Sequence, residues 1–278
     1  MRTGAGSFPG PRTETIHIMF NTTKALVLRE VRYKEADRIL TLLSVEHGKM
    51  SAKARGALRK TSRTAAATQQ LTYSELTLFF NKGKWTVNEG VVLEGFDGLR
   101  SDITAFALGS YFSECLDALC VEDQPDPPLM QLGLNSLYAL SRRLYEQAHI
   151  KAAFELRLMC LAGYTPELYA CAVCGKPEPD EPVLSLESGR ICCRRCRNAA
   201  MGSTAPLCAG SLAAMRYIVS APAKQLFSFA IEAEPLKRLG AAAESYLLRQ
   251  TERRFSTLDY YKSLCAFDAG AIVTEKNK

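Results

Sequence analysis

No apolar run in the sequence approaches the roughly 20 residues that a membrane-spanning helix needs. The N-terminus, MRTGAGSFPGPRTETIHIMF, also lacks the apolar central stretch of a secretory signal peptide. These two absences predict a cytoplasmic protein with no membrane partner. Because thiols in the cytoplasm stay reduced, a cytoplasmic location argues against a disulfide framework for the ten cysteines.

The motifs of common enzyme families are absent as well. The sequence has no G-x-S-x-G elbow, no Walker-type glycine loop and no Ser-His-Asp order. Its three histidines, His17, His47 and His149, are scattered along the chain. We therefore predict no catalytic residues and no enzymatic activity.

Acidic residues are missing between positions 48 and 74. The whole chain is only mildly basic, with a net charge of +6, so this cationic block is a local feature. It is either a solvated loop or a surface that binds nucleic-acid phosphates, and we favour the second interpretation. The predicted phosphate-binding residues are Lys49, Lys53, Arg55, Arg59, Lys60 and Arg63.

The composition, 47% hydrophobic and 23% charged, is that of an ordinary globular protein with enough apolar surface for a core. Residues 1–18 are rich in Gly, Pro, Thr and Arg, and we expect a disordered leader, with Met19 as an alternative start. Residues 22–96 then show a β pattern. A short strand, a strand pair turning at Gly48 and a hairpin turning at Gly83 predict a small five-stranded barrel.

After residue 100 the apolar spacing becomes helical. We expect a helix from Ser101 or Asp102 to about 120, then helices over 129–147 and 150–161, and further helices from about 211. The predicted fold is therefore α+β. Its predicted divisions are a barrel at 19–99, a helical domain at 100–170 and 198–262, a cysteine module at 171–197 and a loose tail at 263–278.

Five of the ten cysteines lie in two clusters within the cysteine module. The pairs Cys171-x-x-Cys174 and Cys193-x-x-Cys196 have the spacing of a four-thiolate zinc site, and Gly175 lets the first turn close. Four protein ligands leave no place for water, so we predict one structural Zn²⁺. Free thiols or a redox pair are the alternatives. We expect Cys192 to be a spectator, and core packing accounts for Cys115, Cys120, Cys160, Cys208 and Cys265.

Four aromatic residues lie on the predicted strands near the cationic block: Tyr73, Phe79, Phe80 and Trp85. Barrels of the OB type bind single strands by combining cations with aromatic stacking, although some of these rings must belong to the core. These residues favour a nucleic-acid partner.

The segments TTKALVLREVRYKEADRILTLLS, KARGALRK, FELRLMCLAGYTPELYACAVCG and SGRICCRRC together resemble the RecO family, in the same order and from about 19 to 261. The resemblance implies an OB barrel, a helical domain with an inserted zinc module, and a nucleoid-associated protein. It also implies binding of single- and double-stranded DNA, strand annealing and help in loading a recombinase. The implied partners are RecR and the C-terminal tail of single-strand-binding protein. Three features depart from the family pattern: the leader, Arg190 in place of a second glycine, and Cys192 in place of an aliphatic residue.

A single-strand-binding tail is acidic with an apolar tip, so its receptor needs an apolar pocket rimmed by cations. We expect this pocket in the C-terminal helices, at Leu236, Lys237, Arg238, Tyr246 and Arg249. Core packing is the alternative role for the apolar members. An RNA-binding or ribosome-associated zinc protein remains the alternative function, since an OB barrel with a thiolate zinc site suits that work too.

Overall fold

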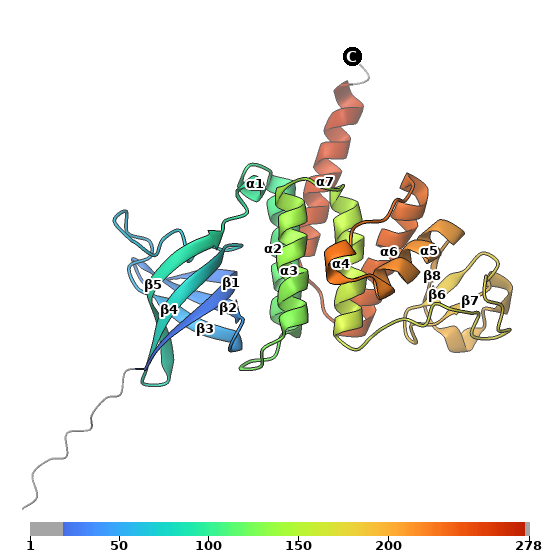
Figure 1. Cartoon of the computed structure of the whole chain (residues 1–278). Helices are drawn as coiled ribbons and strands as arrows, with labels where there is room; N and C mark the ends of the chain where they lie inside the picture. Colours follow the sequence, from blue (N-terminus) through green and yellow to red (C-terminus); the bar gives the residue numbers. More distant parts are fainter. Residues whose placement is uncertain (1–18, 276–278) are drawn as a thin grey trace, which may run out of the picture.

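The computed structural model describes residues 19–275. Figure 1 shows a β-barrel at one end of the molecule, a small sheet at the other end and helices between them. The predicted leader and the last three residues of the predicted tail lie outside the described residues. None of the described helices is long and apolar enough to cross a membrane.

The barrel is closed by five strands in the order β1-β2-β3-β5-β4, as in an OB fold. Parallel pairing of β3 with β5 closes it. Inward-pointing side chains such as Leu40, Leu42 and Met50 alternate with outward ones and fill the interior. The prediction of a five-stranded barrel is confirmed. The strands are β1 (Met19–Tyr33), β2 (Asp37–Ser44), β3 (Gly48–Ala54), β4 (Tyr73–Asn81) and β5 (Lys84–Glu94).

Side-chain caps and prolines set where two of the central helices begin. The Asp102 carboxylate accepts a hydrogen bond from the N–H of Ala105 at 3.0 Å, and Asp126 accepts one from Leu129 at 3.0 Å. Prolines at the first two positions of α3 favour the helix start further. The helices are α1 (Asp97–Arg100), α2 (Ile103–Leu119), α3 (Pro127–Ser141), α4 (Gln147–Leu161), α5 (Ala209–Ser220), α6 (Ala233–Thr251) and α7 (Ser256–Glu275).

The predicted helix over 129–147 is too long, and the one predicted over 150–161 starts too late. Arg143 adopts a left-handed conformation (φ 51°), and the N–H of Leu144 bonds back to the carbonyl of Ala139 at 3.0 Å. This arrangement ends α3 and lets α4 begin at Gln147.

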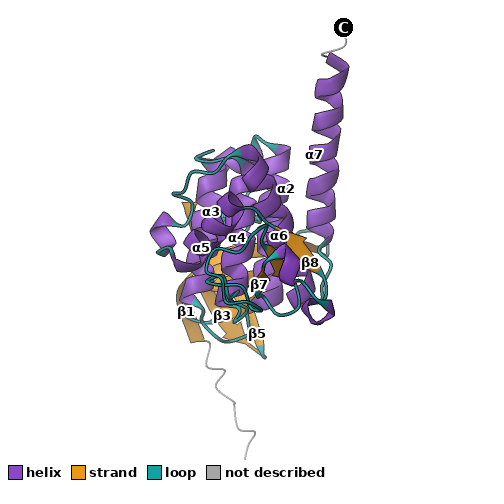
Figure 2. Ribbon diagram, turned by 90° about the vertical axis from the view of Figure 1, so that its right-hand side faces the viewer, coloured by secondary structure: helices purple, strands orange, loops and turns teal. Residues whose placement is uncertain are grey.

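The prediction of a loose tail from residue 263 is wrong as far as residue 275, because these residues continue helix α7. The start of α7 is anchored: Phe255, Leu258 and Tyr261 are buried, and Lys262 Nζ lies 2.7 Å from Glu244 Oε1 of α6. The rest of the helix projects away from the body, as Figure 2 shows most clearly. Cys265, assigned to the core from sequence, is therefore exposed, whereas Cys160 and Cys208 are half-buried and only Cys115 and Cys120 of that set are buried.

The barrel and the helices share one core. Leu26, Leu28 and Leu43 of the barrel belong to the same buried cluster as Phe112 of α2 and Phe154 of α4. A second contact between the two parts is made by backbone, since a Cβ on Gly48 would lie 1.9 Å from the carbonyl oxygen of Gln124. The barrel is thus held against the α2–α3 connection at a junction that tolerates no side chain.

The cysteine module carries its own three-stranded sheet, in the order β7-β6-β8. Its strands are β6 (Val183–Ser185), β7 (Ile191–Cys192) and β8 (Thr204–Pro206), and its short helical turns are η1 (Arg194–Cys196) and η2 (Ala199–Met201). A third such turn, η3 (Ala223–Gln225), follows α5. Because β8 pairs with β6, the module extends past the predicted boundary at 197 to residue 206.

Candidate functional site

The structure brings the two cysteine pairs of the module together. The four Sγ atoms of Cys171, Cys174, Cys193 and Cys196 all lie within 4.8 Å of one another, and those of Cys174 and Cys193 are 3.9 Å apart. In a tetrahedral zinc site with Zn–S bonds of about 2.3 Å, sulfur atoms are about 3.8 Å apart. The cluster therefore has dimensions that fit a bound metal ion, and Cys192 lies outside it.

Backbone geometry aims these sulfurs inward. Cys171 Sγ accepts hydrogen bonds from the backbone N–H groups of Cys174 at 3.5 Å and Cys193 at 3.4 Å. Gly175, with φ 74°, closes the first turn through its N–H bond to the carbonyl of Cys171 at 2.9 Å. Cys192 is the last residue of β7 and is fully buried on the module's own sheet. Its neighbour Cys193 leaves the strand and turns toward the other three thiols.

The pKa values of the clustered thiols shift in opposite directions. Burial acts to raise the pKa of Cys171, but the N–H donors of Cys174 and Cys193 outweigh it and lower that pKa to about 6. A hydrogen bond with Cys174, followed by burial, raises the pKa of Cys196 to about 12. Four adjacent thiolates repel one another unless a cation lies between them. A set of four sulfur donors with no other ligand suits zinc in a structural role.

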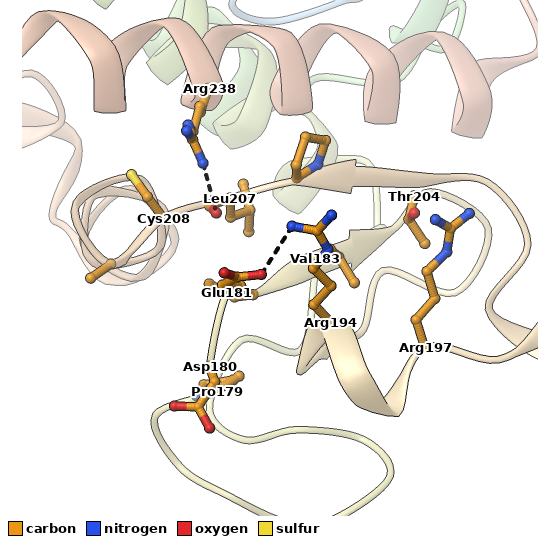
Figure 3. Close-up of a pocket in the computed structure, with 13 residues that line it drawn as sticks. Pro179, Asp180, Glu181, Val183, Arg194, Arg197, Thr204, Leu207, Cys208 and Arg238 are labelled. Carbon is orange, nitrogen blue, oxygen red and sulfur yellow. Dashed lines mark hydrogen bonds and ion pairs between the residues drawn. The ribbon is translucent and has the colours of Figure 1, made fainter.

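A groove of ≈ 730 Å³ lies between the cysteine module and the start of α6. Figure 3 shows guanidinium groups of Arg194 and Arg197 from the module and Arg238 from α6 lining it. Arg194 pairs with Glu181 at 3.0 Å, and Arg238 donates to the carbonyl of Leu207 at 3.4 Å. The groove is therefore a mixed-charge surface.

The apolar residues predicted to form a partner pocket on α6 are not exposed on its surface. Leu236 and Tyr246 are 8% and 2% exposed, because the apolar face of α6 packs inside the helical domain. Lys237 is exposed, but Arg238 pairs with Glu234 at 3.0 Å and Arg249 pairs with Glu187 at 3.2 Å. The helical spacing of the leucines marked this face, and that spacing is also the signature of a core-facing helix.

The six cations of the acid-free stretch fall into two groups. Lys49 Nζ lies 3.2 Å from Asp117 Oδ1 of α2, so it serves the junction between barrel and helices. Lys53 Nζ lies 2.8 Å from Asp37 Oδ2 and 4.9 Å from the centre of the Tyr33 ring. The other four are exposed and form no salt bridge with any described residue: Arg55, Arg59, Lys60 and Arg63.

The connection between β3 and β4, residues 55–72 (the basic loop), is firmly attached to the barrel. Hydrogen bonds from Lys53 and then from the N–H of Gly56 at 2.8 Å lower the pKa of the Asp37 carboxyl. Arg38 donates to the carbonyl of Ala65 at 3.0 Å and to Thr68 Oγ1 at 3.2 Å. The four exposed cations therefore project from an ordered segment.

A groove of ≈ 630 Å³ lies on the outer face of the barrel, next to the start of this loop. Strand pairing assembles it: Thr86 of β5 lies beside Phe79 of β4 on one side and Lys53 of β3 on the other. Tyr33 and Trp85 add two more rings to the lining. Cations and aromatic rings in one groove are the two elements that single-stranded nucleic acids require.

Sequence reasoning missed part of this groove. Lys82 and Lys84 line it together with Lys53 and Arg55, and the motif NKGK, with a lysine on each side of Gly83, was the available signal. Tyr73, considered from sequence, instead packs against the core shared with the helices.

Comparison with known proteins agrees with this architecture. Residues 19–96 match the family model Recombination protein O N terminal, and residues 100–259 match Recombination protein O C terminal. The DNA repair protein RecO of Acetivibrio thermocellus is 35% identical over 242 residues, which cover 87% of this chain and 96% of that protein. The namesakes from Heliobacterium modesticaldum (35% over 237 residues, 82% and 84% covered) and Symbiobacterium thermophilum (30% over 246 residues, 86% and 95% covered) are similar over comparable lengths. The chain therefore belongs to the RecO family of DNA repair proteins.

Proposed function

We propose that this protein is a non-enzymatic mediator of recombinational repair that binds single- and double-stranded DNA on its barrel. It anneals complementary strands and helps a recombinase to replace single-strand-binding protein. The observation that carries the proposal is the aromatic groove beside four exposed cations that have no salt bridge to a described residue. Side chains that are free of carboxylates remain available to phosphates.

Annealing requires that the charge of both strands is neutralised while their bases stay free, and the exposed cations beside the barrel groove suit this requirement. Two strands repel each other until cations neutralise their phosphates, and their bases must remain accessible for pairing. Contacts to phosphate hold the backbone without reading sequence. A cationic, backbone-directed surface therefore favours pairing, whereas tight base recognition would oppose it.

One structural Zn²⁺ bound by the four clustered cysteines completes the proposal. When bound, the ion supplies cross-links that order the module, because its binding energy is also folding energy. The residues would act as ligands only, since four thiolates leave no open position for a substrate. The module would then place its sheet against α6.

The proposed protein partners are RecR and the acidic tail of single-strand-binding protein. The surface that best suits the tail is an apolar groove of ≈ 350 Å³ between α3, α4 and η3. Arg157 lines it, and its buried Nε has no hydrogen-bond partner among the described residues. An apolar tip would enter between Leu132 and Leu161, with the guanidinium of Arg157 near its carboxylate.

The test is fluorescence annealing of complementary DNA strands coated with the cognate single-strand-binding protein. The variant Arg55→Ala/Arg59→Ala/Lys60→Ala should anneal slowly. The variant Arg142→Ala/Arg253→Ala/Arg254→Ala removes the same charge from exposed positions elsewhere and should anneal like the parent. Equal annealing by all three proteins would place the DNA surface elsewhere. Stronger binding and annealing of RNA than of DNA would favour the alternative function.

A further inference from the structure

One edge of the barrel is left open. β5 pairs with β4 along most of its length, but with β3 only at Trp85, Thr86 and Val87. Over residues 88–94, no backbone hydrogen bond reaches the other edge of β5 from any part of the chain that the structure describes. The free N–H and C=O groups of such an edge are a template for a further strand.

The same stretch exposes three consecutive apolar side chains. Val91, Val92 and Leu93 are 63%, 39% and 46% exposed. Successive side chains of a strand point to opposite faces, so Val91 and Leu93 share the outer face. Val92 lies on the face of Gly90, where a Cβ would be 2.8 Å from Ala67 of the basic loop, and it stays partly exposed beyond that contact. Soluble proteins usually protect an open edge with charged residues, proline or β-bulges. This stretch has Glu89 and two register shifts in its pairing with β4, but no lysine or proline, and its three apolar side chains remain exposed. An exposed apolar edge is characteristic of an interaction surface.

Charge indicates what kind of strand fits this edge. Glu75 lies beside Val91 in the β4–β5 register, and Glu89 lies two residues before it on the same face. The nearest lysine in this register, Lys24 of β1, lies on the far side of Glu75 from Val91 and so does not line the open edge. Two copies of this edge in antiparallel contact would bring their acidic residues together, which disfavours self-association. The complementary partner carries apolar residues flanked by lysine or arginine.

We propose that the open edge of β5 is a docking site at which a partner protein adds a strand that is apolar at its centre and basic at its flanks. Val91 is six residues beyond Trp85, about 20 Å along the strand, so a partner here leaves the DNA groove free. The choice of RecR as the probe rests on the proposed function, and the site itself rests on the strand geometry.

The first test compares the affinity of RecR for the parent, for Val91→Lys/Leu93→Lys and for Val31→Lys. Val31 is 48% exposed on β1 and is the matched control for placing a lysine at an apolar strand position. The edge variant should bind RecR at least tenfold more weakly, and the control should bind like the parent. Unchanged affinity in the edge variant, or no binding of RecR to the parent, would overturn the proposal.

A second measurement does not depend on how the variant folds. Amide hydrogen exchange of the parent should slow at residues 88–93 when RecR is added. Binding of RecR without protection there would also overturn the proposal. Annealing of uncoated DNA separates the two claims: if the parent anneals but the edge is not engaged, only the docking site fails, whereas a parent that cannot anneal contradicts the proposed function.

Discussion

Arg216 of α5 and Glu178 of the cysteine module form an ion pair, with Nη1 and Oε1 2.7 Å apart. The same guanidinium donates to the carbonyl oxygens of Leu168 at 2.8 Å and Tyr169 at 3.3 Å, before the first cysteine pair. It also donates to that of Pro177 at 2.9 Å, after the pair. One helical side chain thus joins both ends of the turn that carries Cys171 and Cys174, and it holds this turn against the helical domain.

Removing this clamp should weaken metal binding without removing a ligand. Partners behind metal ligands typically change affinity by about 10–100-fold, and we expect Arg216→Gln to lower zinc affinity by about tenfold, measured by competition with a chromogenic chelator. Arg216→Lys should recover little, because an ammonium cannot reach four acceptors in a planar arrangement. Arg249→Gln, which removes an exposed ion pair to Glu187, is the control. Unchanged zinc affinity in Arg216→Gln would show that the clamp only positions the module.

Zinc content should distinguish the two adjacent cysteines. Cys193→Ser should lose most of the bound metal and loosen the module, because the metal's binding energy supplies much of its order. Cys192→Ser should keep a full equivalent of zinc, since its thiol packs beside Cys171 and Cys193 but is not one of the four clustered sulfurs, and the loss of stability should be modest. Elemental analysis of protein prepared without chelator measures both. The reverse pattern would exchange the two assignments.

The salt dependence of DNA binding should report the phosphate-binding cations. Each phosphate of a single strand that is no longer neutralised lowers the slope of log K against log salt by about 0.7. Arg55→Ala/Arg59→Ala/Lys60→Ala should therefore flatten the slope by about 2 and weaken binding most at low salt. Lys49→Ala should change the slope little, because Lys49 already pairs with Asp117. A larger effect from Lys49→Ala than from the triple change would contradict the division of the six cations.

Binding of the single-strand-binding tail should depend on Arg157. Titration of a labelled tail peptide should give an affinity about tenfold lower for Arg157→Ala, or about 1.4 kcal/mol, because the variant loses the cation beside the apolar groove. Arg238→Ala changes the groove of Figure 3 and should bind the peptide like the parent. The opposite result would assign the tail to the groove beside the cysteine module.

Gly48 and Gly83, two left-handed glycines at strand turns of the barrel, should differ in their tolerance of a side chain. Both have positive φ, so Gly83→Ala should lose about 1–2 kcal/mol of stability from backbone strain alone. Gly48→Ala should lose more, because its Cβ would collide with the carbonyl of Gln124, whereas a Cβ on Gly83 would meet none of the described residues within 4 Å apart from its chain neighbours. Thermal unfolding of both variants measures the difference. Equal destabilisation would mean that the barrel moves away from the α2–α3 connection at little cost.

Local signals in the sequence were sufficient for much of this protein. Alternating apolar residues with turns at Gly48 and Gly83 predicted the barrel, because strand period and turn chemistry depend on near neighbours. The C-x-x-C spacing likewise predicted that the two sulfurs of each pair lie close together, because it depends on residues only three positions apart. The acid-free stretch identified the basic loop, since net local charge requires no knowledge of the fold.

Tertiary structure decided which of these residues are available. Lys49 and Arg55 look alike in sequence, but only the packing of β3 against α2 supplies the carboxylate of Asp117 that occupies Lys49. The helical spacing of apolar residues predicted that Leu236 and Tyr246 lie on one face of α6, but it could not predict which part of the chain covers that face. The open edge of β5 has no sequence signature either, because it depends on where β3 stops pairing. Partners distant along the chain determine burial, ion pairing and free edges, and only the folded structure brings those partners together.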